Sequence, residues 1–184
     1  MNVATQISGN IRPNSNTFAS LVSLLAYIGI YVTQSPADES LFYAPEANEA
    51  WQQYNEALDF YESIAHSAFH IVSADEPITQ ETGLHILYAM TKNRPIVTTG
   101  ALHFSATLSP FIKGIVAKHG ALFHSVNPAT LDLPDLQRLL GTLQPTDYRL
   151  SKTQHILIAS MVKTHFRTLL ESAKPQQINL STLA

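Results

Sequence analysis

The chain has 184 residues, of which 45% are hydrophobic and 14% are charged, a composition that suits one compact domain with a sizeable core. Its formal net charge of −3 argues against a nucleic-acid polymer as partner, and the absence of cysteine excludes disulfides, thiolate catalysis and cysteine-based metal sites. No apolar run approaches the roughly 20 residues that span a bilayer, and the first residues do not resemble a secretion signal. A soluble, cytoplasmic protein without membrane contact is therefore expected.

Strand-like and helix-like patterns alternate along most of the chain. Gly29 and Gly120 mark helix ends, and Pro110 marks a helix start. In chain order, the patterns predict strands over about 3–8, 30–33, 69–72, 96–99 and 121–124. Helices are predicted over about 17–27, 46–66, 79–93, 110–119 and 131–140.

This alternation predicts an α/β fold, with a five-stranded parallel, doubly wound sheet of the flavodoxin-like or Rossmann-like kind. Residues 1–140 would form this α/β domain. Residues 141–184 depart from the rhythm and are predicted as a helical extension that packs on the same domain or on a dimer partner. Its helix, from Lys152 to about Leu170, is amphipathic. The residues on its apolar side are Ile158, Met161, Val162, Phe166 and Leu169.

The central strand–helix–strand segment, from Ala68 to Val97, is the expected location of a site. In open α/β sheets, ligands bind at the loops that follow the carboxyl ends of strands. Asp75 and Glu76 come just after such a strand, where catalytic carboxylates often lie, although solvated loop residues are an equally good interpretation.

Glu81 and His85 lie four residues apart on one face of the predicted central helix. They could form an acid/base couple or provide two metal ligands, but on spacing alone a surface contact is the commoner arrangement. Because no third ligand is identifiable nearby, no metal is expected. No other cofactor is expected either.

Two segments could hold an anion. Gly9-Asn10-Ile11-Arg12 follows the first strand. It has a glycine at the turn and an arginine whose guanidinium group can form bidentate hydrogen bonds with an anion. Ser109-Pro110 opens a helix, where a hydroxyl and free backbone N–H groups lie together. An ordinary loop and an ordinary N-cap are the commoner alternatives.

Taken together, these segments resemble the nucleoside 2-deoxyribosyltransferase superfamily, and within it the 2′-deoxynucleoside 5′-monophosphate N-glycosidases. The resemblance covers about Val3 to Leu140. Gly9-Asn10-Ile11-Arg12 is similar to the family's Gly-Ser-Ile-Arg phosphate loop, and Gly83 to Val97 to its central helix and the strand that follows. Leu108-Ser109-Pro110-Phe111-Ile112-Lys113-Gly114 resembles its Leu-Ser-Ala-Met-Ile-Arg-Gly segment. The resemblance implies that Gly9, Asn10, Arg12, Gly83 and Ser109 serve phosphate or substrate binding.

The resemblance also implies where catalytic groups would lie. In the family, a glutamate on the central helix attacks the anomeric carbon or stabilises its positive charge, and an aspartate from the preceding helix assists. The alignment puts His85 at the glutamate's position, and it puts Phe60 or Tyr61 at the aspartate's, with Asp59 adjacent. An imidazole cannot replace a carboxylate beside an oxocarbenium ion.

Two functions follow from this resemblance. In the first, the chain cleaves or transfers an N-glycosidic bond of a nucleotide, with Glu81 replacing the missing nucleophile and Asp59 or Asp75 assisting. In the second, it binds a nucleotide or phosphorylated sugar without catalysis and acts as a regulatory protein. A purely structural role without a ligand is the third possibility. A homodimer is expected, because family members complete their sites with the segment equivalent to Ser109 from a neighbouring subunit.

Overall fold

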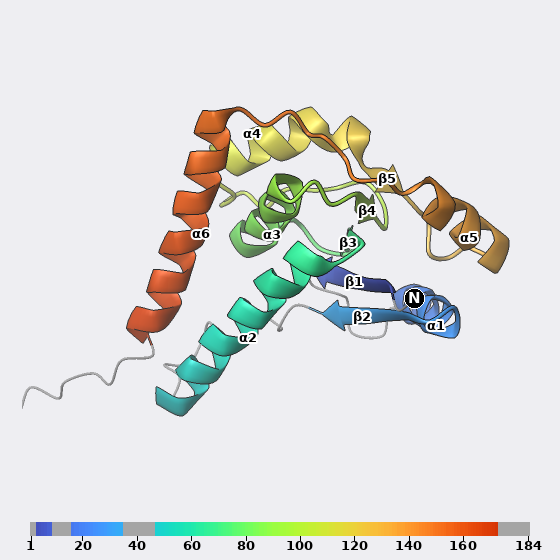
Figure 1. Ribbon diagram of the computed structural model, residues 1–184, viewed down its shortest axis with the longest axis horizontal. Helices are drawn as coiled ribbons and strands as arrows, with labels where there is room; N and C mark the ends of the chain where they lie inside the picture. Colours follow the sequence, from blue (N-terminus) through green and yellow to red (C-terminus); the bar gives the residue numbers. More distant parts are fainter. Residues whose placement is uncertain (1–2, 9–15, 35–46, 173–184) are drawn as a thin grey trace, which may run out of the picture.

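The computed structural model describes residues 3–8, 16–34 and 47–172 and shows an α/β structure with a parallel sheet (Figure 1). The strands are β1 (Val3–Ser8), β2 (Ile30–Gln34), β3 (Phe69–Val72), β4 (Ile96–Thr98) and β5 (His124–Ser125). The helices are α1 (Asn16–Tyr27), α2 (Ala47–His66), α3 (Gln80–Thr91), α4 (Pro110–His119), α5 (Leu133–Thr142) and α6 (Lys152–Ser172), with a 3₁₀ turn η2 (Gly120–Leu122). Within these ranges, no helix combines the length and the apolar character that crossing a membrane requires.

The sheet has the strand order β2-β1-β3-β4-β5, and each pair of neighbouring strands is parallel. β1 lies between β2 and β3, with Thr5 aligned with Val32 on one side and Phe69 on the other. The predicted α/β class with a parallel sheet is therefore confirmed.

Helices cover both faces of the sheet. Successive residues of a strand point to opposite faces, so β3 contributes side chains to both layers. Phe69 and Ile71 of β3 pack with Leu25 of α1 and Leu136 of α5 in one apolar cluster. Val72 belongs to a second and larger cluster. This larger cluster contains buried residues of α2, α3, α4 and α6. His70, between Phe69 and Ile71, consequently faces this second layer.

Helix α3 begins and ends with defined caps. The Thr79 hydroxyl accepts a hydrogen bond from the Thr82 backbone N–H at 3.2 Å, as an N-cap residue does. At the other end, Asn93 takes a positive φ of 53°, and the Arg94 N–H donates to the Ala89 carbonyl at 3.0 Å. These caps fix the helix that carries Glu81 and His85.

The predicted strand over 121–124 is wrong at its start. Residues 120–122 form η2 instead, closed by a hydrogen bond from the Phe123 N–H to the Gly120 carbonyl at 3.1 Å. Only His124 and Ser125 pair with β4, opposite Val97 and Thr98. A short apolar run is compatible with either a strand or a tight turn, and here the turn that ends α4 takes the first residues.

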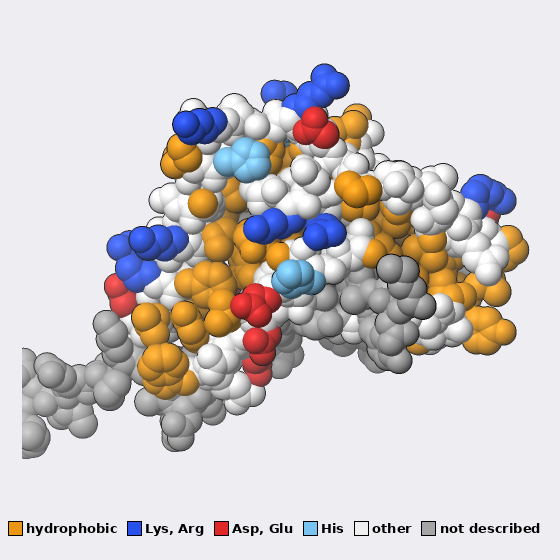
Figure 2. Space-filling view, viewed as in Figure 1, with side chains coloured by type: hydrophobic (Ala, Val, Ile, Leu, Met, Phe, Trp, Pro, Cys, Tyr) orange, Lys and Arg blue, Asp and Glu red, His pale blue; other side chains and the backbone are white. Residues whose placement is uncertain are grey.

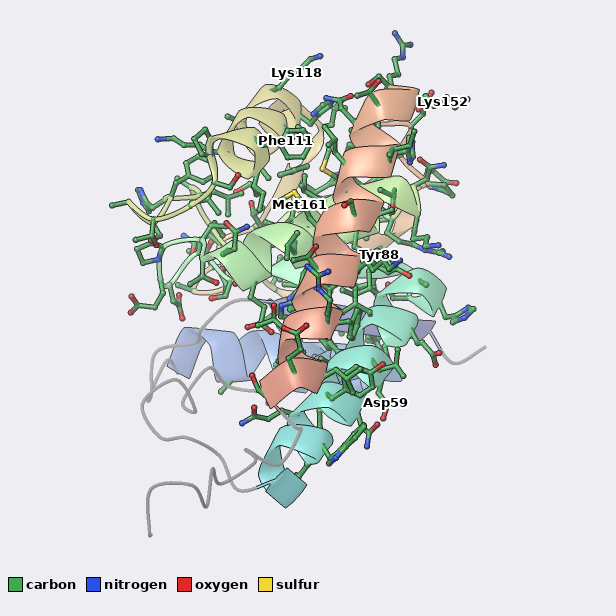
Figure 3. The ribbon with its side chains drawn as sticks, turned by 90° about the vertical axis from the view of Figure 1, so that its left-hand side faces the viewer. Asp59, Tyr88, Phe111, Lys118, Lys152 and Met161 are labelled. Atoms are coloured by element: carbon green, nitrogen blue, oxygen red, sulfur yellow. The ribbon has the colours of Figure 1, made fainter. Side chains whose placement is uncertain are left out.

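The segment after α5 packs back on the same chain. Tyr148 is buried, and its hydroxyl donates to the Arg94 carbonyl at 2.9 Å. α6 then lies along α2 and α3 (Figures 1 and 3). Ile158 is buried there, and Met161 and Val162 pack against the same cluster, which confirms the predicted apolar side of α6. The division into domains at residue 140 stays a prediction.

Candidate functional site

Two loops at the carboxyl edge of the sheet are hydrogen-bonded to each other. They follow β3 and β4 and lead into α3 and α4. The Ala74 N–H donates to the Thr99 hydroxyl at 2.9 Å. Further along, the Ile78 N–H donates to the His103 carbonyl at 2.7 Å, and the Ser105 N–H donates to the Ile78 carbonyl at 3.1 Å. These hydrogen bonds join the two loops at the edge where a ligand is expected.

Asp75 lies in the first of these loops and is half-buried. Its backbone N–H donates to the Ser73 hydroxyl at 3.3 Å. One carboxylate oxygen, Oδ2, is buried and has no hydrogen-bond partner among the described residues. Burying a carboxylate oxygen without a hydrogen-bond partner costs free energy of folding. We therefore expect a ligand or solvent group to donate a hydrogen bond to Asp75.

Glu81 and His85 lie next to each other, as their spacing predicts. Glu81 Oε1 is 3.9 Å from His85 Nε2, which is too long for a hydrogen bond. The Glu81 side chain is 29% exposed, whereas the His85 side chain is only 2% exposed. The pair therefore lies at the boundary between the core and the carboxyl edge, and it is not the surface contact that spacing alone favours.

His85 is enclosed by aromatic rings from α2. Its ring centroid lies 4.7 Å from that of Phe60 and 5.0 Å from that of Tyr61. Burial, followed by the neighbouring His70 and His165, lowers the pKa of His85 well below its usual value. His85 is thus neutral at physiological pH and presents a hydrogen-bonding group rather than a charge.

Two further buried side chains, those of His70 and Tyr61, lie near His85. His70 is fully buried, and neither ring nitrogen has a hydrogen-bond partner among the described residues; burial lowers its pKa to about 3. Tyr61 is also buried, and its hydroxyl has no partner in the same set of residues. Burial raises the pKa of Tyr61, and the charge of Glu81 raises it further. We refer to Tyr61, His70, His85 and His165 as the histidine–tyrosine cluster.

α6 covers the cluster from outside. The rings of His165 and Phe166 lie 6.2 Å and 5.1 Å from that of Tyr61. Phe166 also contacts Tyr54, at 5.8 Å between centroids. Figure 3 shows α6 crossing in front of α3 and beside α2. Side chains of α6 thus occupy the space outside the position that the resemblance assigns to the nucleophile.

His70 and His165 were not identified from the sequence as candidate residues. His70 lies in a short apolar strand and His165 in a helix outside the family resemblance. Each is an ionisable residue within an otherwise apolar pattern. His70 also follows His66 by four residues, but the change from helix to strand between them does not place the two on one face.

Asp59 does not lie in the cluster. Its side chain is exposed, and Figure 3 shows it on the outer edge of α2. Figure 2 shows acidic side chains on the face of the molecule turned to the viewer. Glu62, three residues further along α2, is also exposed. Phe60 and Tyr61 are the residues of α2 that face His85, while the assisting role of Asp59 stays a prediction.

Ser109 is the N-cap residue of α4 but makes no side-chain capping hydrogen bond. Its backbone N–H donates to Oε1 of Gln80, at the start of α3, at 3.1 Å. The two helix starts are thus linked at the carboxyl edge, and Gln80 is a residue of this edge that the sequence did not suggest. The Ser109 hydroxyl is not used for capping.

Gly83 lies where α3 crosses α4. A Cβ at this position would lie 2.6 Å from Ile112 Cγ2 and 3.3 Å from Leu108 Cδ1. The missing side chain therefore allows close helix packing, and substrate binding by Gly83 stays a prediction.

The predicted phosphate loop, Gly9, Asn10 and Arg12, lies outside the described residues. Over the described ranges, no three His, Asp or Glu side chains are close enough together to hold a metal ion.

No protein-family model and no curated protein sequence matches this chain. Among solved structures, the chain is similar to the CMP N-glycosidase BcmB of Clostridium botulinum, with 13% identity and a TM-score of 0.40 over 75% of this chain and 98% of that one. It is also similar to a conserved protein from Enterococcus faecalis V583, with 12% identity and a TM-score of 0.36 over 89% of this chain and 99% of that one. Similarities at this level do not place the chain in a family.

Proposed function

We propose that this chain is a nucleoside deoxyribosyltransferase-like protein that binds a nucleotide or phosphorylated nucleoside at the carboxyl edge of its sheet without cleaving it. The strand order β2-β1-β3-β4-β5 supports a flavodoxin-like, doubly wound fold. In such a sheet, ligands bind where the chain changes winding direction, here between β1 and β3. The predicted phosphate residues Gly9, Asn10 and Arg12 directly follow β1 in the sequence.

The observation that carries the non-catalytic part of this proposal is the burial of His85. It is the residue that the resemblance assigns to the position of the family's catalytic glutamate. In the structure its side chain is 2% exposed and lies against Phe60 and Tyr61. A glycosidic transition state has oxocarbenium character and needs a nearby anion. A neutral, enclosed imidazole does not provide one.

Glu81 supports a second candidate function, N-glycosidic cleavage or transfer. It is a partly exposed carboxylate, one helical turn before His85 and 3.9 Å from its ring. Its location in the first turn of α3 is close enough to the edge for a ligand bound in a shifted position, about 5.4 Å along the helix. In this case Asp75, with its buried oxygen lacking a partner among the described residues, would be the assisting group.

A binding and turnover screen separates these functions. The purified protein is titrated with ribonucleoside and deoxyribonucleoside 5′-monophosphates and with ribose 5-phosphate, and each mixture is then assayed for free base by chromatography. Binding without released base is expected, with about 2.7 kcal/mol of added stability at a hundred times the dissociation constant. Base release that Glu81→Gln abolishes would establish the second candidate, and no binding by any of these compounds would contradict both.

Arg12→Ala and Ser109→Ala test the phosphate side of the proposal. Each is expected to weaken nucleotide binding, since a charged hydrogen bond contributes roughly 1.5–3 kcal/mol and a neutral one roughly 1 kcal/mol. Arg149→Ala removes an exposed arginine distant in sequence from these residues and is the matched control. Equal affinities in Arg12→Ala and wild type would contradict phosphate binding by Arg12.

A homodimer is part of the same proposal. Ser109 lies at the carboxyl edge with its hydroxyl unused for capping, which leaves it available to a neighbouring subunit's ligand. Light scattering coupled to size-exclusion chromatography measures the molar mass, and a monomer at micromolar concentration would contradict this part alone.

A further inference from the structure

A cavity of about 310 Å³ lies beside the ends of β4 and β5, between the β4–α4 loop and the second half of α4. Its lining includes Thr98, Gly100, Phe104, Val116, Phe123 and Ser125. This volume falls at the lower end of the range of small-molecule sites, which are typically apolar with a few placed polar groups.

Two aromatic rings from separate segments form part of its wall. Phe104 is held in place by its bridge to Ile78, and Phe123 by an edge contact with Tyr148 at 6.2 Å. Both rings are half-buried, so each keeps some surface toward the cavity. Aromatic walls of this kind favour a flat ring as ligand.

The polar groups of the cavity are two hydroxyls. Thr98 and Ser125 are aligned neighbours at the ends of β4 and β5, and Thr98 is 4% exposed. Neither hydroxyl makes a hydrogen bond to another described residue. No described residue that lines the cavity is charged. Hydroxyls both donate and accept, so the cavity suits a neutral ring with mixed hydrogen-bonding groups rather than a phosphate.

The cavity adjoins the proposed nucleotide site. The ideal Cβ position of Gly100, in its lining, is 3.4 Å from the Ala74 Cβ, and the next residue of that loop is Asp75. Outside the cavity, Lys113 Nζ lies 5.8 Å from the centre of the Phe104 ring. A ring bound inside would therefore leave its attached sugar and phosphate near the carboxyl edge and near a cation.

We propose that this cavity binds the heterocyclic base of the nucleotide, against Phe104 and Phe123, with the Thr98 and Ser125 hydroxyls as hydrogen-bond partners. The inference rests on the proposed nucleotide binding and names the part of the chain that recognises the base.

Two independent variants test it. Ala117→Phe fills the cavity from α4, and the Thr98→Val, Ser125→Ala double variant removes both hydroxyls with little change of shape. The controls are Ala121→Phe, an exposed alanine outside the lining, and Thr107→Val, an exposed hydroxyl in the β4–α4 loop. Melting temperatures establish that each variant is folded, and calorimetry gives dissociation constants for the best nucleoside monophosphate and for ribose 5-phosphate.

Both cavity variants are expected to raise the dissociation constant of the nucleotide by roughly tenfold or more. The double variant loses two neutral hydrogen bonds to the base, and Ala117→Phe fills the space that the base would occupy. Ribose 5-phosphate should bind them as it binds the wild type, and both controls should bind the nucleotide normally. Unchanged nucleotide binding in both variants, or an equal loss of ribose 5-phosphate binding, would overturn the base site but not the proposed function. A wild type that binds none of the nucleotides would overturn the proposed function itself.

Discussion

Glu81 and His85 lie 3.9 Å apart on one turn of α3, yet they occupy opposite environments. The carboxylate is 29% exposed at the start of the helix, whereas the imidazole is 2% exposed beside two aromatic rings of α2. The Glu81 carboxylate is therefore accessible to a ligand, whereas the core encloses the His85 imidazole four residues further along. Of the two, Glu81 is the one that can act as a catalytic group.

His85→Glu is expected to destabilise the protein rather than to create a catalyst. A carboxylate at this position would be buried beside Phe60 and Tyr61, with Glu81 of like charge one turn away. The expected loss is roughly 3–5 kcal/mol of unfolding free energy at neutral pH, measured by urea denaturation. His66→Glu, at the exposed end of α2, is the control and should change the free energy by less than about 0.5 kcal/mol. Equal stability of the two variants would show that the position of His85 is open to water.

The free energy of unfolding is expected to fall as the pH drops below about 6.5. His70 has its pKa lowered to about 3 by burial, and burial also lowers the pKa of His85. The unfolded chain therefore binds protons that the folded chain does not, so stability is complete above about 6.5 and is lost progressively toward about 3. Each such proton contributes a slope of about 1.4 kcal/mol per pH unit.

His70→Phe separates this effect from other titrations in the same range. The variant should show a shallower loss of unfolding free energy between pH 6.5 and pH 4.5 than the wild type, because one buried imidazole is gone. His155→Phe, an exposed histidine on α6, should keep the wild-type slope. The groups that face the cluster, Glu81 and His165, are unchanged in both variants. Identical slopes in all three proteins would contradict a buried, neutral His70.

The sequence predicted most of the fold because strand and helix patterns are local properties. The limits of β3 and the apolar side of α6 match their patterns, since all four residues of β3 are buried and α6 packs its apolar side on the larger cluster. The start of β5 was mislocated because Ala121 and Leu122 suit a tight turn as well as a strand.

The candidate site was predicted only in part, for a different reason. Glu81 and His85 could be paired by their spacing on one helix. The enclosure of His85 depends instead on Phe60 and Tyr61 of α2, with His70 and His165 nearby, and no short-range pattern indicates contacts between residues so remote in sequence. Gln80 was missed for the same reason, because its partner is the start of another helix.

Phe166→Ala is expected to loosen α6 from α2. Phe166 contacts both Tyr54 and Tyr61, and Tyr54 contacts Trp51, which is the single tryptophan of the chain. Figure 2 shows apolar side chains where these two helices lie side by side. Removing a half-buried ring should cost roughly 2–3 kcal/mol of unfolding free energy and shift the tryptophan emission.

Leu157→Ala is the matched control for that change. Leu157 also lies on α6 but is 43% exposed, so its removal should leave the emission unchanged and cost less than about 1 kcal/mol. A wild-type emission spectrum in Phe166→Ala would contradict the contact of α6 with α2 at this point.

Gly83→Ala tests the close approach of α3 to α4. In an open helix position, this substitution stabilises by roughly 0.5–1 kcal/mol, because alanine loses less backbone entropy on folding. At Gly83 the new methyl group would lie 2.6 Å from Cγ2 of Ile112, a fully buried side chain that cannot move freely. A net loss of roughly 1–3 kcal/mol is therefore expected from overpacking.

Gly114→Ala in α4 provides the opposite result within the same pair of helices. Apart from its chain neighbours and the backbone of its own helix, no described atom lies within 4 Å of the position that the new methyl group would take. The full gain from reduced entropy should therefore appear in urea denaturation. In a double-mutant cycle, Gly83→Ala should cost less when Ile112 is replaced by alanine, because the clashing methyl group is then absent. A stabilising Gly83→Ala would contradict the contact, and with it the orientation of the helix that presents Glu81 to the carboxyl edge.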